Sequence, residues 1–142
     1  YGRGPVENYA DRKSSAFLGR YKQTADEQAY PYIRPQETGT KSDMREWTQT
    51  DKGGRGLMFT SPTPFYGSAL RYSIESLDNG DKKTQRHFQE VDKIPYVNLL
   101  LDSAQSGVAG VNSWNALPLK QYRMPFGKQQ LTLLITPVKK LF

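Results

Sequence analysis

Glycine and proline recur along the whole of this chain of 142 residues, and they limit the length of any regular element more than any other feature. The sequence holds twelve glycines and nine prolines, and turn-forming clusters stand at 51–54, 61–64 and 126–127. Aromatic residues make up 12% of the chain. Short aromatic and β-branched runs between such turn clusters are typical of antiparallel β-structure. The pattern therefore predicts an all-β fold, either an antiparallel sandwich or a barrel.

Eight runs have the character of strands, and the clearest is the apolar and β-branched run near the C-terminal end, which we expect to be buried on at least one face. The predicted strands are 17–21, 30–34, 44–50, 56–60, 64–72, 96–102, 119–125 and 130–138. Helix signals are few. A short helix is predicted at 73–77 with Ser73 as its cap, and a second is compatible with 84–91. Long loops are expected at 22–29 and 103–117.

Composition excludes several kinds of site. The chain has no cysteine and a single histidine, His87, so disulfides, thiolate metal sites and sites with two imidazole ligands are excluded. Its net charge is +6, but the basic residues are dispersed. We interpret them as a solvated surface and predict no nucleic-acid partner. No apolar run has the length of a membrane span, so no membrane partner is predicted.

Two polar clusters admit more than one interpretation. Glu7, Asn8, Asp11 and Arg12 lie within six residues. They could supply a carboxylate pair for acid–base chemistry or a network that satisfies backbone groups in an irregular turn, and we favour the network. The cluster that begins at 35–39 and includes Arg45 is either a polar sugar-binding rim or a loop in which Arg45 fixes a carboxylate. The run at 2–5 is predicted to be a tight turn rather than a phosphate-binding loop.

The two tryptophans stand in different contexts. Trp47 lies within a strand pattern and is predicted to be in the core. Trp114 ends a loop that is rich in glycine, asparagine and serine, and no core is evident for it to enter. The residue pattern alone leaves binding and packing equally open for Trp114.

Four motifs in order resemble a known family. They are G-P-x-E-N-Y-x-D-R at 4–12, Y-x-x-P-Q-E-x-G at 32–39, Arg45, and G-x-x-S-W at 110–114. This set resembles the small-chain region, or C-terminal domain, of glycoside hydrolase family 2 β-galactosidases. We predict that the following motif residues have structural roles: Glu7, Asn8, Asp11, Arg12, Gln36, Glu37 and Arg45.

The resemblance implies a fold and a position within a larger protein. The expected fold is an antiparallel β-sandwich of the galactose mutarotase-like kind (a super-sandwich). Relatives have a domain about twice as long, so residues 1–142 are expected to be its C-terminal half, a partial domain with exposed strand edges. A preceding (β/α)₈ barrel would carry the catalytic glutamates, and it would also hold the implied Mg²⁺ and Na⁺. No catalytic residue, metal ligand or cofactor is therefore predicted in this chain.

The resemblance also implies a function. The chain would be a non-catalytic part of a retaining exo-β-galactosidase, with upstream domains as partners and a homo-oligomer as the assembly. Trp114 would project into the barrel's site as a platform for the galactoside, with Asn112 and Ser113 shaping the loop. Relatives often carry an acidic residue or glycine where Val111 and Asn112 stand, so the aglycone preference can differ.

The alternative is a free-standing, lectin-like carbohydrate-binding module. Cytoplasmic and periplasmic locations are both compatible with the sequence.

Overall fold

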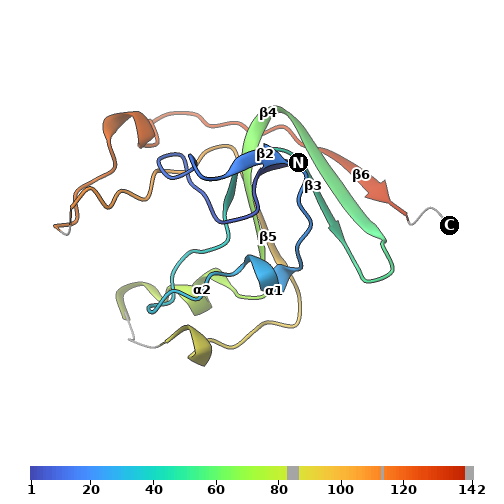
Figure 1. The fold of residues 1–142 in the computed structure, drawn as a ribbon, viewed down its shortest axis with the longest axis horizontal. Helices are drawn as coiled ribbons and strands as arrows, with labels where there is room; N and C mark the ends of the chain where they lie inside the picture. The colour runs from blue at the N-terminus through green and yellow to red at the C-terminus, as the bar shows by residue number, and fades with distance from the viewer. Residues whose placement is uncertain (83–86, 113, 140–142) are drawn as a thin grey trace.

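Two antiparallel sheets form the framework of the computed structural model, which describes residues 1–82, 87–112 and 114–139 (Figure 1). The two-stranded sheet contains β1 (Gly2–Gly4) and β2 (Phe17–Gly19). The four-stranded sheet contains β3 (Lys41–Thr50), β4 (Gly56–Leu70), β5 (Asn98–Asp102) and β6 (Leu134–Val138). The described helices are all short: α1 (Ala25–Gln28), α2 (Ile74–Leu77) and 3₁₀ turns at Gly80–Lys82, Phe88–Glu90 and Lys120–Tyr122. The all-β prediction is confirmed, and the mutarotase-like sandwich stays a prediction.

Strand β4 organises the larger sheet. It pairs with β3 along most of its length, with β5 at residues 66–70 and with β6 at residues 56–60. The prediction of two separate strands, 56–60 and 64–72, is wrong. Residues 61–64 lie opposite Arg45, and the register of the described strands gives them no Cα partner. Pro62 and Pro64 fit there because an unpaired stretch does not need their missing N–H groups.

A tight turn joins β3 to β4, as the cluster at 51–54 predicts. Asp51 receives a backbone hydrogen bond from Gly54 and donates one to Arg55, and its carboxylate accepts the Arg55 N–H. Gly54 has a φ of 78°, a conformation that glycine adopts without strain. The turn therefore fixes the register of the β3–β4 hairpin.

The core consists of two clusters of buried side chains. The first lies on β3 and β4 and contains Met44, Trp47, Phe59, Phe65 and Ala69, with Leu99, Leu101 and Leu131 packed against it. The second lies around α2 and contains Leu70, Tyr72, Leu77, Phe88 and Val91. Trp47 is 7% exposed, which confirms its predicted place in the core.

Two predicted strands are wrong because other contacts take up their backbone groups. At 30–34, the Thr38 hydroxyl accepts a hydrogen bond from Tyr30 N and donates one to Tyr30 O, so a side chain replaces a strand partner. At 119–125, the chain forms the 3₁₀ turn Lys120–Tyr122, in which Tyr122 N donates to Leu119 O.

The last predicted strand, 130–138, is correct only in part. Strand β6 begins at Leu134, and the side chains of Leu134 and Ile135 are 66% and 52% exposed. The expectation of a buried face is therefore wrong. Strand β6 pairs with the part of β4 next to the hairpin turn, on the right in Figure 1. The residue that packs against the core is Leu131, just before the strand.

Two further local predictions differ from the structure. The run at 2–5 contains strand β1 rather than only a turn. The loop expected at 22–29 contains α1, whose capping box joins Thr24 and Glu27. The helix predicted at 73–77 is confirmed by α2 with Ser73 as its N-cap. In the second predicted helix, residues 84–86 lie outside the described residues, and Phe88–Glu90 forms a 3₁₀ turn.

Candidate functional site

The candidate site is the loop that carries Trp114, together with the N-terminal segment that contacts the base of this loop. In Figure 1 the loop belongs to the orange segment that extends away from the sheets. Trp114 is 87% exposed. Its backbone N–H donates to Asn112 Oδ1 over 2.9 Å, so Asn112 shapes the turn that precedes the indole. Ser113, the third predicted substrate-binding residue, lies outside the described residues.

The contact between the N-terminal segment and this loop is made by adjacent residues. Asp11 accepts hydrogen bonds from two consecutive backbone N–H groups: Val108 N to Oδ1 at 3.1 Å and Ala109 N to Oδ2 at 2.9 Å. Arg12 Nη2 donates to Ala109 O over 2.9 Å. The two side chains thus bind both the donor and the acceptor of a single residue, Ala109.

Glycine at 107 and 110 permits this close approach. A Cβ at Gly107 would lie 2.5 Å from Asp11 Oδ2, and one at Gly110 would lie 2.3 Å from Arg12 Nη2. Gly110 also has a φ of 82°, in the left-handed region. The sequence shows these glycines as part of a flexible-looking loop. Two glycines three residues apart could have indicated a loop that packs closely against another segment. The backbone amides of Val108 and Ala109 could not have been identified from the sequence, because every residue type except proline has one.

The turn that presents Asp11 and Arg12 is fixed by its own backbone. Arg12 N donates to Tyr9 O at 2.9 Å and Tyr9 N donates to Arg12 O at 3.3 Å. Asn8, which is buried, anchors this turn to the larger sheet. Its Oδ1 accepts from Ser42 N at 3.0 Å and from the Ser42 hydroxyl, and its backbone N–H donates to Thr40 O.

Glu7 serves a different contact from Asp11. Its carboxylate accepts from Gly39 N at 2.6 Å and from the Tyr32 hydroxyl. Burial, with the hydrogen bond to Glu7, raises the pKa of the Tyr32 phenol to about 12. Nearby, burial lowers the pKa of the Lys41 ammonium to about 8, and Glu7 partly opposes this shift. Glu7 and Asp11 each bind backbone groups, an arrangement that matches a structural network rather than an acid–base pair.

The remaining predicted motif residues are separated from the Trp114 loop. Gln36 and Glu37 are exposed and lie between α1 and β3. Glu37 accepts a hydrogen bond from the Thr40 hydroxyl at 3.0 Å. Arg45, on β3, donates from Nη1 to Asp43 O, and its guanidinium lies over the ring of Tyr1. The carboxylate of Asp43 is bound instead by Arg3 and Lys13.

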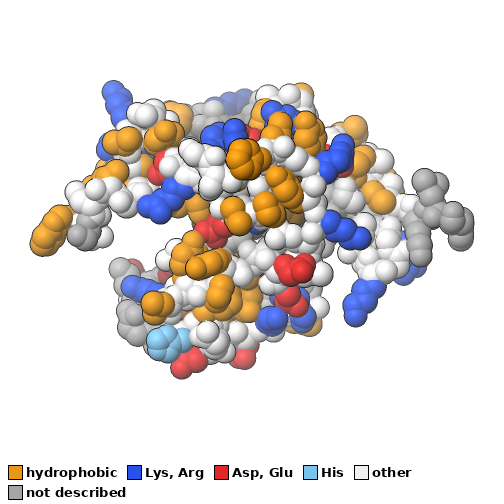
Figure 2. Space-filling model, viewed as in Figure 1, with side chains coloured by type: hydrophobic (Ala, Val, Ile, Leu, Met, Phe, Trp, Pro, Cys, Tyr) orange, Lys and Arg blue, Asp and Glu red, His pale blue; other side chains and the backbone are white. Residues whose placement is uncertain are grey.

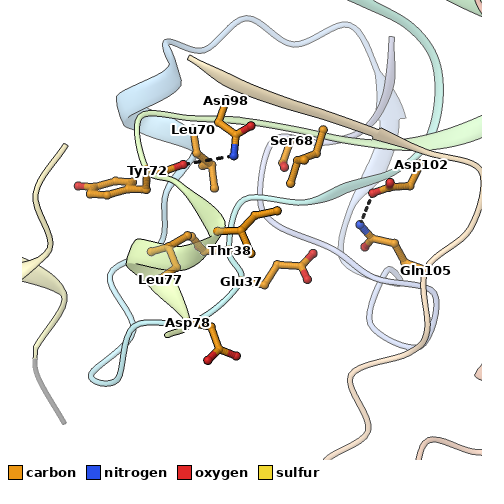
Figure 3. Close-up of a pocket in the computed structure, with 12 residues that line it drawn as sticks. Glu37, Thr38, Ser68, Leu70, Tyr72, Leu77, Asp78, Asn98, Asp102 and Gln105 are labelled. Atoms are coloured by element: carbon orange, nitrogen blue, oxygen red, sulfur yellow. Dashed lines mark hydrogen bonds between the residues drawn. The ribbon is translucent and has the colours of Figure 1, made fainter. Parts of the chain in front are cut away.

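A cavity of about 320 Å³ has Glu37 and Thr38 of the second motif among its lining residues. Figure 3 shows Tyr72 and Leu77 at one end, Thr38 and Glu37 between, and Asp102 with Gln105 at the other end. Gln105 Nε2 donates to Asp102 Oδ2 over 2.9 Å. The sequence raised a polar rim at 35–39 as one interpretation, but it did not indicate the rest of this cavity, because the lining comes from segments that are distant in the chain. Neither Trp114 nor Asn112 lines it.

Charge and metal ligands add no further site in the part of the chain that the structure describes. No three His, Asp or Glu side chains are grouped there as a metal ion would need. Figure 2 shows lysine and arginine side chains scattered over the visible face rather than gathered in one patch. The helices among the described residues are too short to cross a lipid bilayer.

Comparison with known proteins gives a consistent result over most of the chain. A family model described as β-galactosidase small chain matches residues 1–135. The chain is 39% identical over 124 residues to a β-galactosidase of Priestia megaterium, which covers 87% of the chain and 12% of that protein. It is 34% identical over 140 residues to a β-galactosidase of Streptococcus thermophilus, covering 97% of the chain and 13% of that protein. A Vibrio cholerae β-galactosidase is 36% identical over 137 residues, 95% of the chain and 12% of its own length.

Proposed function

This chain belongs to the β-galactosidase small-chain family, and we propose that it is a non-catalytic part of a retaining exo-β-galactosidase. In this proposal the chain is the C-terminal half of the small-chain domain. Its Trp114 loop completes the sugar site, which lies mainly on the catalytic barrel. The chain covers only a small part of each relative's length, which supports placing the catalytic machinery in a different part of the enzyme.

The observation that carries the proposal is the exposure of Trp114 at the end of a loop whose base is fixed. An indole that is 87% exposed leaves its flat face free to stack on the C–H face of a pyranose. The hydrogen bonds of Asp11 and Arg12 hold the base of the loop, so the indole would be presented in a defined position. A loop whose backbone is already held at its base loses less conformational entropy on binding, which favours a role in recognition.

The glutamates of this chain support a non-catalytic role. Retaining glycosidases use two carboxyl groups about 5 Å apart around the anomeric carbon. Glu7 binds Gly39 and Tyr32, Glu27 caps α1, and Glu46 pairs with Arg20. We therefore place the catalytic pair on the barrel, outside this chain. Mg²⁺ and Na⁺, which the family resemblance implies, are assigned to the barrel as well.

The test uses a chromogenic nitrophenyl β-galactoside and the enzyme that carries this chain. Trp114→Ala is expected to raise KM about tenfold, the equivalent of losing about 1.4 kcal/mol of stacking, with a smaller change in kcat. Tyr96→Ala is the matched control, because Tyr96 is an exposed aromatic residue outside the loop. An unchanged KM in Trp114→Ala would contradict the proposed role of the loop.

The isolated chain tests the domain assignment. We expect it to release no nitrophenol, since it lacks a catalytic carboxyl pair. Hydrolysis by the chain alone would overturn the assignment. Weak galactoside binding by the chain alone, lost in Trp114→Ala, would favour the lectin-like alternative.

A further inference from the structure

We propose that Asp11 and Arg12 are positioning residues that set the direction in which the loop presents Trp114. This inference rests on the proposed function of Trp114, but the contacts themselves lie within the described chain. It gives a specific and separately testable role to the D-R pair that ends the first sequence motif.

The contacts fix the orientation of consecutive peptide planes at the base of the loop. Asp11 binds the N–H groups of Val108 and Ala109 with separate carboxylate oxygens, and Arg12 binds the carbonyl of Ala109. Hydrogen bonds to charged groups are stronger than those between neutral groups. Because the bound residues stand only a few positions before Trp114, any rotation at Ala109 would be transmitted to the indole.

The backbone at Ala109 has an unfavourable conformation that needs other contacts to stabilise it. Ala109 has a φ of 60° and Gly110 a φ of 82°. The left-handed conformation costs a non-glycine residue about 1–2 kcal/mol. Asp11 and Arg12 bind the N–H and the carbonyl of Ala109, so they offset that cost and hold the bend. Without them Ala109 would return to its ordinary conformation, and the residues after it would point elsewhere.

Few other contacts could hold the loop in place. Among the described residues, Gly107 N donates to Tyr122 O at 2.7 Å, and the Trp114 backbone N–H makes a local hydrogen bond with Asn112. The turn bearing Asp11 is joined to the larger sheet through Asn8 and Ser42. Hydrogen bonds therefore join β3 to the turn and the turn to the loop, and the backbone from Asn8 to Asp11 connects the two contacts.

The experiment compares Asp11→Asn and Arg12→Ala with the parent sequence in the full-length enzyme. Hydrogen–deuterium exchange of the peptide that covers 107–115 reports on the loop, and KM and kcat for the nitrophenyl galactoside report on the site. We expect faster exchange in this peptide and a rise in KM of about tenfold, with a smaller change in kcat. In Arg12→Lys, which keeps a cationic donor, KM is expected to stay close to that of the parent enzyme. Asp92→Asn, at an exposed carboxylate elsewhere, is the control.

A double variant separates positioning from general destabilisation. If Asp11 acts through Trp114, then Asp11→Asn adds little to KM in a Trp114→Ala background, whereas independent effects would multiply. Unchanged exchange in the loop peptide, or a full additional rise in KM in the double variant, would overturn the inference. A third outcome is faster exchange in Asp11→Asn with KM unchanged in both Asp11→Asn and Trp114→Ala. It would confirm that Asp11 holds the loop and would refute the proposed function of Trp114.

Discussion

Replacing Asn8 with alanine is expected to destabilise the chain by about 3 kcal/mol, although Asn8 is distant from the Trp114 loop tip. Asn8 is 1% exposed. Its amide donates to Val6 O at 2.9 Å and to Arg3 O at 3.3 Å, and its oxygen accepts from both the N–H and the hydroxyl of Ser42.

The magnitude follows from the groups that alanine would leave without a partner. Ser42 is fully buried, so water cannot replace the lost acceptor. An unsatisfied buried donor costs about 1–3 kcal/mol, and Ser42 would have two. The hydroxyl can rotate toward another acceptor, whereas the N–H cannot. Two such donors would together cost about 2–6 kcal/mol, and rotation of the hydroxyl removes part of this cost, so we take about 3 kcal/mol, in the lower half of that range.

The assay is urea unfolding followed by tryptophan fluorescence, since Trp47 is buried in the folded chain. Gln130→Ala is the control, because Gln130 is an exposed amide side chain. A loss of less than about 1 kcal/mol in Asn8→Ala would show that the Asn8–Ser42 contacts do not anchor the turn, and the reasoning would be refuted.

A second variant, Asn8→Asp, gives the same reasoning a pH dependence. One carboxylate oxygen keeps the contacts with Ser42, while the other faces the carbonyl oxygens of Val6 and Arg3 and has nothing to accept. Burial and the two carbonyl oxygens that face the second carboxylate oxygen outweigh the Ser42 donors, and they raise the pKa of the new carboxyl in the folded state above its unfolded value of about 3.9. The folded state then binds more protons, so the variant loses stability as pH rises from about 4 through the folded pKa.

Three further predictions concern the framework. Burial lowers the pKa of Lys41 from 10.5 to about 8. The folded state therefore binds fewer protons than the unfolded state between these pH values, and the free energy of unfolding rises by up to about 3 kcal/mol as pH rises through them. Urea unfolding of the parent and of Lys41→Met at pH 7 and pH 10 measures this rise. A stability difference between the two proteins that does not change with pH would contradict it. Gly67→Ala would place a Cβ 2.8 Å from Trp47 Cε3 and is expected to lower stability by about 1–3 kcal/mol, measured by thermal unfolding. Arg20→Ala is expected to change stability by less than about 1 kcal/mol, since this ion pair is exposed, and to raise the lowered pKa of Glu46 toward its usual value in an NMR titration.

The parts of the fold that depend on neighbouring residues could be predicted from the sequence. The turn at 51–54 and the cap at Ser73 are local signals, and both are confirmed. The capping box of Thr24 and Glu27 was equally local and was missed. Strand assignments failed where the outcome depended on residues outside the run itself: Thr38 takes the backbone groups of Tyr30. They also failed at 56–72, where β4 continues through two prolines.

The candidate site also has parts that the sequence predicts and parts that it does not. The position of Trp114 in a long irregular segment follows from the glycine-rich composition around it. The contact of Asp11 with Val108 does not, because the two residues are 97 positions apart and the partner is a backbone amide, which any residue type supplies. The cavity beside Glu37 is also built from distant segments, so no single run of the sequence describes it.

The arrangement of strands around β4 has a consequence for the order in which the chain folds. The β3–β4 hairpin closes through a short turn, whereas β5 and β6 return to β4 only after long intervening stretches. Closing a short loop costs less entropy and takes microseconds, whereas pairing over long sequence separations is slow. The hairpin is therefore the natural nucleus, and β5 and β6 add to opposite ends of a strand that already exists. Substitutions in the turn at 51–54 should slow folding, while substitutions in β6 should mainly speed unfolding.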